Sequence, residues 1–128
     1  MNIVDSSGWL EYLAAGPNAG FYTKPIEDTK ELLVPSISIY EVFKRVVQQK
    51  SENEALQVIA LMQQGQVVNL DPSIAVSAAR VSIQHQMPMA DAIMLATARN
   101  NKSILWTQDA HFEGIQNVNY KKAVPSAK

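Results

Sequence analysis

Short apolar segments alternate along this chain with longer segments of helical periodicity, and this alternation restricts the possible folds more than any other feature. The expected strands are five apolar runs at residues 2–4, 32–34, 66–70, 103–106 and 118–120. Between them, apolar side chains recur at helical spacing, for instance over residues 36–47 and 72–85. Parallel strands need a crossover helix between them, so the pattern predicts an α/β sandwich with a mostly parallel sheet.

Two stretches carry a weaker pattern. Residues 16–20, which read Gly-Pro-Asn-Ala-Gly, are expected to break the first helix, and residues 26–31 are expected to form a weakly helical piece. The tail over residues 121–128 is expected to be frayed.

Length and composition limit the class of protein. A chain of 128 residues can bury one hydrophobic core, and without a linker or internal repeat we predict a single domain over residues 1–128. The hydrophobic fraction of 47% and the charged fraction of 18% are typical of a soluble globular protein. The absence of cysteine excludes disulfides, thiolate metal sites and a cysteine nucleophile. With neither a signal peptide nor an apolar run long enough for a membrane span, we expect a cytoplasmic protein that does not bind membranes.

One carboxylate lies inside the apolar segment 87–98. Pro88 suits the first position of a helix, which places Asp91 in the first turn, where the helix dipole favours an anion. Helix stabilisation alone would explain such a residue. However, the neighbours Ala92, Ile93 and Met94 make the segment look buried, and a buried carboxylate is costly unless it is paired or binds a metal ion.

Three further acids come at the end of an expected strand or just inside the following helix: Asp5, Glu41 and Asp109. The carboxyl ends of parallel strands meet at one edge of the sheet, where ligands bind in open α/β folds. Asp91 can join them if its helix begins at the same edge. Four carboxylates gathered there would repel one another unless cations held them, and hard oxygen ligands select Mg²⁺ or Mn²⁺.

Each acid also has a purely structural explanation. Asp5 and Asp109 can cap the elements that follow them, and Ser38 with Glu41 matches a capping box. Asp71, before Pro72, has an equally good capping context and no other predicted role. Spacing alone therefore does not separate Asp71 from the other four acids.

The order of four motifs carries a family resemblance. The segments are Ile-Val-Asp-Ser-Ser at 3–7, Tyr-Glu-Val at 40–42, Ala-Asp-Ala at 90–92 and Thr-Gln-Asp-Ala-His-Phe at 107–112. The set resembles the PIN-domain nucleases, and most closely the VapC-type toxins of bacterial toxin–antitoxin modules. This resemblance implies a three-layer α/β/α fold and Mg²⁺- or Mn²⁺-dependent endoribonuclease activity, in which an RNA phosphodiester is hydrolysed to a 5′-phosphate and a 3′-hydroxyl.

Carried over by position, the resemblance assigns six residues. The metal-binding and catalytic acids would be Asp5, Glu41, Asp91 and Asp109, with Ser7 beside the first acid and Thr107 orienting the last. Asp5 and Asp91 are the first choices as direct ligands, and Glu41 as either a ligand or a water-positioning base. His111 receives no role.

The resemblance also implies partners. With a net charge of −1, any RNA-binding surface must be local, and the candidate basic residues are Lys44, Arg45, Arg80, Arg99 and Lys102. A cognate antitoxin would bind a groove between the helices, where exposed Trp9, Tyr12 and Leu13 would suit it. The family further implies a homodimer.

Two other functions compete with this prediction. A PIN fold can serve as a nuclease or a binding protein outside a toxin module. A phosphoacceptor receiver domain is also α/β with an acidic pocket, and Asp71 after an apolar run, together with Thr107, could imitate one. A receiver, however, needs an acidic pair after its first strand, where this chain has Asp5 followed by two serines.

Overall fold

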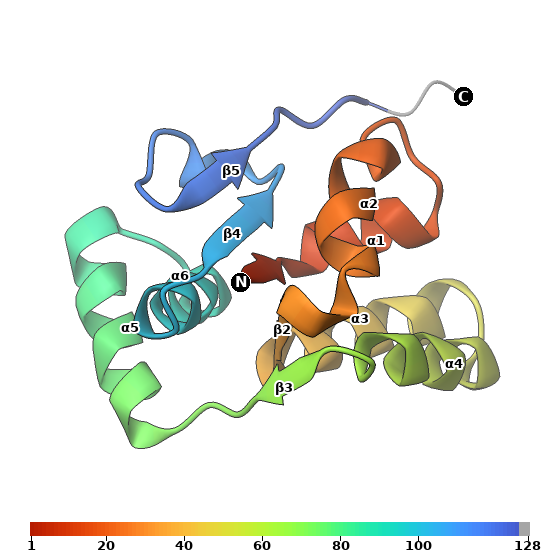
Figure 1. The fold of residues 1–128 in the computed structure, drawn as a ribbon, viewed down its shortest axis with the longest axis horizontal. Coiled ribbons are helices and arrows are strands. Elements are labelled where there is room, and N and C mark those ends of the chain that lie inside the picture. Colours follow the sequence, from red (N-terminus) through yellow and green to blue (C-terminus); the bar gives the residue numbers. More distant parts are fainter. Residues whose placement is uncertain (126–128) are drawn as a thin grey trace.

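Five parallel strands form one sheet in this computed structural model, which describes residues 1–125 (Figure 1). The strands are β1 (Asn2–Val4), β2 (Leu32–Pro35), β3 (Gln66–Val68), β4 (Ile104–Thr107) and β5 (Val118–Tyr120). Their order across the sheet is β3-β2-β1-β4-β5, and each neighbouring pair is parallel. The predicted α/β class with a parallel sheet is therefore confirmed.

Helices cover both faces of this sheet. They are α1 (Ser6–Leu13), α2 (Ala19–Glu27), α3 (Ser36–Gln49), α4 (Glu52–Met62), α5 (Pro72–His85) and α6 (Met89–Asn100). In Figure 1, α5 and α6 lie on one side of the strands and the first four helices on the other. Successive strand residues point to opposite faces, so Ile3 packs in the core under α5 and α6, and Val4 in the core under α1 to α4. The three-layer arrangement is confirmed.

The strand order fixes where a ligand site can form. From β1 the chain builds outward through β2 and β3, then returns to the other side of β1 for β4 and β5. Ligands of open α/β sheets bind at the carboxyl ends of the strands beside such a reversal, which here lies between β1 and β4. A receiver domain has the order 2-1-3-4-5, so the phosphoacceptor alternative is wrong.

The expectation for residues 16–31 is wrong in part. The chain forms the regular helix α2 over Ala19–Glu27, followed by a 3₁₀ turn over Thr29–Glu31. Gly20 and Pro25 lie within this helix, and their low helix propensity is the reason that the sequence did not predict it. Tyr22 and Ile26, one turn apart, are buried against the sheet, and this burial outweighs the poor helix propensity.

The C-terminal end of the described chain adds little to the core. Residues 121–125 have no regular secondary structure, whereas residues 126–128, where fraying was also expected, lie outside the described residues. Within residues 1–125, none of the helices has the length and apolar character to cross a membrane.

Close packing of α1 on α2 predicts that one glycine cannot be enlarged. A Cβ atom on Gly8 would lie 2.5 Å from Tyr22 Cε1 and 2.7 Å from Val4 Cγ1, whereas one on Gly20 would meet no atom within 4 Å. We expect Gly8→Ala to lower the free energy of unfolding by about 1–3 kcal/mol through overpacking. Gly20→Ala, the matched control, should raise it by about 0.5–1 kcal/mol. Urea denaturation followed by circular dichroism measures both, and equal effects would contradict the tight α1–α2 contact.

Candidate active site

Four carboxylates from four segments of the chain line one hollow at the carboxyl edge of the sheet. Its volume is about 160 Å³, and its lining residues are Asp5, Ser6, Ser7, Glu41, Asp91, Met94 and Asp109. The first acid directly follows β1, the last follows β4, Glu41 lies in α3, and Asp91 lies in the first turn of α6. The structure thus brings together the four acids that the sequence singled out. Asp71 lies outside this hollow and accepts a hydrogen bond from Ile74 N as the N-cap of α5.

Asp5 is the most buried of these acids. Its residue is 5% exposed, and its carboxylate accepts hydrogen bonds from Gly8 N at 2.9 Å, Ser7 Oγ at 2.9 Å and Thr107 Oγ1 at 2.5 Å. Burial raises the pKa of Asp5 to about 6, opposed by these three hydrogen bonds and assisted by the nearby charge of Asp109. The three donors hold the carboxylate in one orientation, but they do not fully offset its desolvation.

Thr107 connects the first acid with the last. Its buried hydroxyl donates to Asp5 Oδ2 and accepts from the backbone N–H of Asp109 at 2.9 Å. The backbone N–H of Asp5 in turn donates to Trp106 O at 3.2 Å. These bonds fix the ends of β1 and β4 relative to each other.

Glu41 is held by Ser6, a serine that the sequence suggested only as an alternative N-cap of the first helix. Ser6 Oγ donates to Glu41 Oε1 at 2.5 Å, while the neighbouring Ser7 donates to Asp5. The predicted capping box with Ser38 is wrong, because α3 begins at Ser36 and the Ser38 hydroxyl donates to Pro35 O at 2.6 Å. The sequence signal that could have identified Ser6 is its position next to Ser7 in the first turn of α1. The two neighbouring hydroxyls donate to two different acids.

Two acids in the hollow are also helix caps. Asp5 is the N-cap of α1, and Asp109 accepts from His111 N at the start of the 3₁₀ turn Ala110–Phe112. Capping and lining the hollow are thus two uses of the same side chain. The N-terminal end of a helix favours an anion, which partly offsets the repulsion between neighbouring carboxylates.

His111 is a residue of this site that the sequence analysis missed. Its Nδ1 lies 2.7 Å from Asp91 Oδ2 and 3.1 Å from Asp109 Oδ1. The pKa of His111 is raised, first by the hydrogen bond to Asp91 and then by the charge of Asp109. The pKa of Asp91 is also raised, because burial and the charge of Asp109 outweigh the effect of His111. The two-residue spacing from Asp109 was the available sequence signal.

The chemistry of these side chains fits a divalent cation. Carboxylate oxygens are the ligands that Mg²⁺ and Mn²⁺ prefer, and burial and mutual repulsion raise the pKa of both Asp5 and Asp91. One ligand atom each of Asp91, Asp109 and His111 lie within 4.8 Å of one another, while Asp5 and Glu41 line the same hollow. These residues could hold a metal ion.

A second, larger hollow continues from the acids toward basic side chains. Its volume is about 370 Å³, and it shares Ser6, Ser7 and Glu41 with the acidic hollow. Lys44 and Arg45, one turn further along α3, complete its polar wall. The other basic candidates, Arg80, Arg99 and Lys102, lie outside both hollows.

The apolar surface near the first helices differs from the expectation in one residue. Trp9, suggested as an exposed contact for an antitoxin, is buried in the core at 1% exposure, as its helical spacing with other apolar residues also allowed. Leu13 does line an apolar hollow of about 180 Å³ between α1, α3 and α4, together with Leu10, Val46 and Val58. Tyr12 is half-buried, and its hydroxyl donates to Glu27 Oε2 at 2.9 Å.

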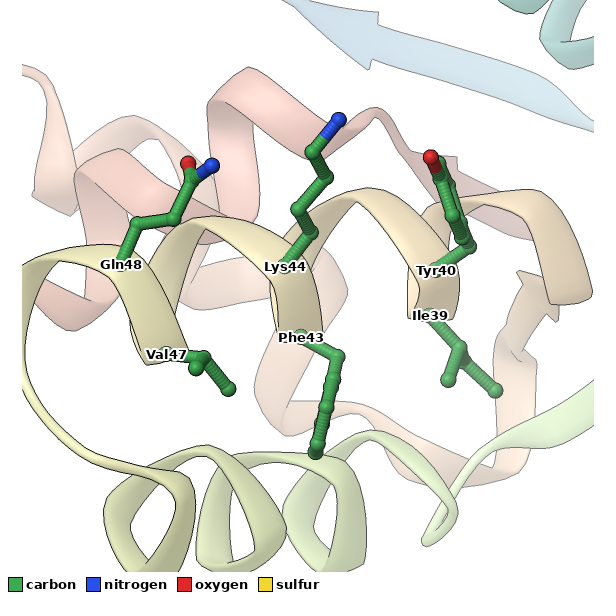
Figure 2. Close-up of a pocket in the computed structure, with 6 residues that line it drawn as sticks. All are labelled: Ile39, Tyr40, Phe43, Lys44, Val47 and Gln48. Atoms are coloured by element: carbon green, nitrogen blue, oxygen red, sulfur yellow. The ribbon is translucent and has the colours of Figure 1, made fainter.

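Another hollow, of about 490 Å³, lies along α3 (Figure 2). Figure 2 shows Ile39, Phe43 and Val47 on the side of α3 that faces α4, with Tyr40, Lys44 and Gln48 on the other side. Lys44 Nζ lies 5.8 Å from the centroid of the Tyr40 ring, at cation–π distance. Polar and apolar walls thus run side by side along one helix.

The raised pKa of Asp5 predicts that the metal-free fold loses stability as pH rises. The folded carboxyl, with a pKa of about 6, binds its proton more tightly than in the unfolded chain, where the value is 3.8. The resulting stabilisation is fully present below pH 3.8 and is lost as pH rises through 6. The side chain of Asp5→Asn cannot ionise. As pH rises from 4 to 8 in EDTA, the free energy of unfolding of wild type should therefore fall by about 3 kcal/mol relative to that of Asp5→Asn.

Urea denaturation at a series of pH values measures this difference. The raised pKa values of Asp91 and His111 act in the same direction in both proteins, so the comparison isolates Asp5. A pH dependence identical in the two proteins would show that the ionised Asp5 carboxylate is not costly to the fold.

Comparison with solved structures shows the same fold in toxin–antitoxin proteins. A toxin–antitoxin complex from Klebsiella pneumoniae is similar with a TM-score of 0.79 and 18% identity, over 93% of this chain and 96% of that chain. VapBC2 from Rickettsia felis, solved with a promoter DNA fragment, has a TM-score of 0.73 and 9% identity, over 94% and 97%. VapC20 from Mycobacterium tuberculosis, a Sarcin-Ricin loop cleaving toxin, has a TM-score of 0.71 and 14% identity, over 92% and 98%.

Sequence comparison gives the family. No curated protein matches the chain. The family model of the PIN domain, however, matches residues 3–117, a range that contains all four acids of the hollow. This chain belongs to the PIN domain family.

Proposed function

We propose that this chain is a Mg²⁺- or Mn²⁺-dependent endoribonuclease and the toxin of a toxin–antitoxin pair. The observation that carries the proposal is the convergence of Asp5, Glu41, Asp91 and Asp109 in one hollow at the carboxyl edge of the sheet. Family membership and the similarity of the fold to VapC20, a toxin that cleaves the Sarcin-Ricin loop, support RNA as the substrate.

Each acid has a proposed role in this reaction. Asp5 and Asp91 would be direct oxygen ligands of the ion, joined by Asp109, and a bound ion would activate water and neutralise charge on the scissile phosphate. Ser7 and Thr107 keep Asp5 oriented through the hydrogen bonds described above. Glu41, held by Ser6, would ligate the ion or accept a proton from the attacking water. Cleavage leaves a 5′-phosphate and a 3′-hydroxyl.

The second hollow supplies a path for the RNA backbone. Lys44 and Arg45 lie in the same wall as Glu41, so phosphates on either side of the scissile bond can meet cations while the scissile phosphate meets the acids. A local basic strip of this kind suits RNA binding by a chain whose net charge is −1.

The antitoxin is proposed to bind in two apolar hollows formed by the helices. The one between α1, α3 and α4 includes Leu13, and the one along α3 includes the exposed Tyr40 (Figure 2). Solved neighbours of the same fold are complexes of a toxin with its antitoxin. A homodimer acting in the cytoplasm completes the proposal, and the exposed Val76 and Ile83 of α5 are candidates for the dimer contact.

Cleavage of bulk tRNA and rRNA by the purified protein tests the nuclease. We expect cutting with Mg²⁺ or Mn²⁺, its abolition by EDTA, and a loss of at least about a hundredfold in Asp91→Asn, because a charged ligand is removed. Asp71→Asn makes the same chemical change in a helix-capping acid outside the hollow and should cut like wild type. Activity that survives both EDTA and Asp91→Asn would refute the assignment.

Binding of RNA tests the basic strip separately from cleavage. In the Asp91→Asn background, replacing both Lys44 and Arg45 with Gln should weaken binding of labelled tRNA. It should also reduce the slope of log K against log salt by about 1–1.5, from two lost phosphate contacts. The control pair Arg80→Gln and Lys102→Gln removes the same charge from positions outside the hollows. Fluorescence anisotropy at several salt concentrations measures both, and equal slopes for the two pairs would place the RNA elsewhere.

A further inference from the structure

His111 holds a position that a structural role does not explain. Its ring bridges two acids from different elements, Asp91 in α6 and Asp109 after β4, with Nδ1 2.7 and 3.1 Å from their oxygens. The side chain is nonetheless 56% exposed, and exposed ion pairs add little to stability. The ring therefore lies at the open side of the acidic hollow, in contact with two of its acids.

The backbone beside His111 is fixed independently of this contact. Asp109 N donates to the buried Thr107 hydroxyl, and His111 N donates to Asp109 Oδ1. Phe112, the next residue, is fully buried in the core under α5 and α6. The ring is thus carried on a short turn that is anchored on both sides, as a ligand for a metal ion needs to be.

The two distances from His111 Nδ1 to the carboxylate oxygens are close to those between neighbouring ligands in a coordination shell. Neighbouring ligands around an octahedral ion with bonds of 2.0–2.1 Å lie about 3 Å apart. The two separations from His111 Nδ1 are 2.7 and 3.1 Å, and all three ligand atoms lie within 4.8 Å of one another. An ion could contact Asp91, Asp109 and His111 together with little movement of the side chains.

We propose that His111 ligates the bound ion through nitrogen beside Asp91 and Asp109, and that it makes the site select Mn²⁺ over Mg²⁺. An all-oxygen site suits Mg²⁺, whereas an imidazole nitrogen adds affinity for first-row transition metals. This inference rests on the proposed function in one respect, that the acidic hollow binds a divalent ion.

Metal binding without RNA tests the inference. The full chain, stripped with EDTA and then dialysed, is titrated with MnCl₂ and separately with MgCl₂ by isothermal calorimetry. We expect His111→Ala to weaken Mn²⁺ binding at least about tenfold and to change Mg²⁺ binding by less than about threefold. His85→Ala, at the chain's other histidine on α5, should bind both ions like wild type.

Pulsed electron paramagnetic resonance of the Mn²⁺-loaded protein gives a direct second readout. A nitrogen ligand produces a ¹⁴N modulation, which should be present in wild type and His85→Ala and absent in His111→Ala. Bound Mn²⁺ without this modulation would overturn the nitrogen ligand while leaving the acidic metal site intact. Tighter binding of both ions by His111→Ala would overturn it as well, because His111 would then compete with the metal.

The same titration separates this inference from the function on which it rests. Loss of Mn²⁺ binding in Asp91→Asn, together with unchanged binding in His111→Ala, would leave the acidic metal site standing and remove His111 from it. Failure of the wild-type protein to bind either ion would refute the metal site itself, and both proposals with it.

Discussion

The hydrogen bond from Thr107 to Asp5 joins the carboxyl ends of the two central strands, and the acidic hollow depends on it. The donor and the acceptor are both buried, so neither has water as an alternative partner. The same hydroxyl accepts from Asp109 N, which sets the start of the turn that carries His111. One side chain therefore positions the first acid, the last acid and the histidine. Even so, the pKa of Asp5 stays raised at about 6, so the metal-free fold contains a carboxylate that is incompletely compensated. A cation would remove that deficit.

The parallel sheet explains why acids from distant segments meet without excessive repulsion. Helices α1 and α3 follow β1 and β2, and α6 precedes β4, so all three begin at the carboxyl edge. Asp5 caps the first of these helices, and Asp91 lies in the first turn of the last. The positive ends of the helix dipoles converge where the negative charges gather. Topology therefore supplies part of the electrostatic compensation, and a bound ion would supply the remainder.

The sequence predicted the layers and the four acids, but it could not predict contacts that depend on topology. Alternating apolar runs were sufficient for the fold class, because crossover helices follow from parallel strands. Asp71 and Asp5 have the same local capping context, and the structure distinguishes them by strand position: β3 is at the edge of the sheet and β1 at its centre. Helix α2 was missed because Gly20 and Pro25 lower its propensity, whereas Tyr22 stabilises it through tertiary burial.

The two walls of the hollow differ in exposure, and this difference bears on how an ion and an RNA could share it. Asp5 is almost fully buried and held by three donors, whereas the Asp91 and Asp109 side chains are 19% and 31% exposed. Because its three donors already hold the Asp5 carboxylate in one orientation, little side-chain entropy would be lost when it binds an ion. The second hollow shares Glu41 with the acidic one and extends to Lys44 and Arg45, so a backbone phosphate could approach along it. The exposed His111 side chain contacts both of these more exposed acids through Nδ1. A nitrogen ligand at this position would favour Mn²⁺ over Mg²⁺.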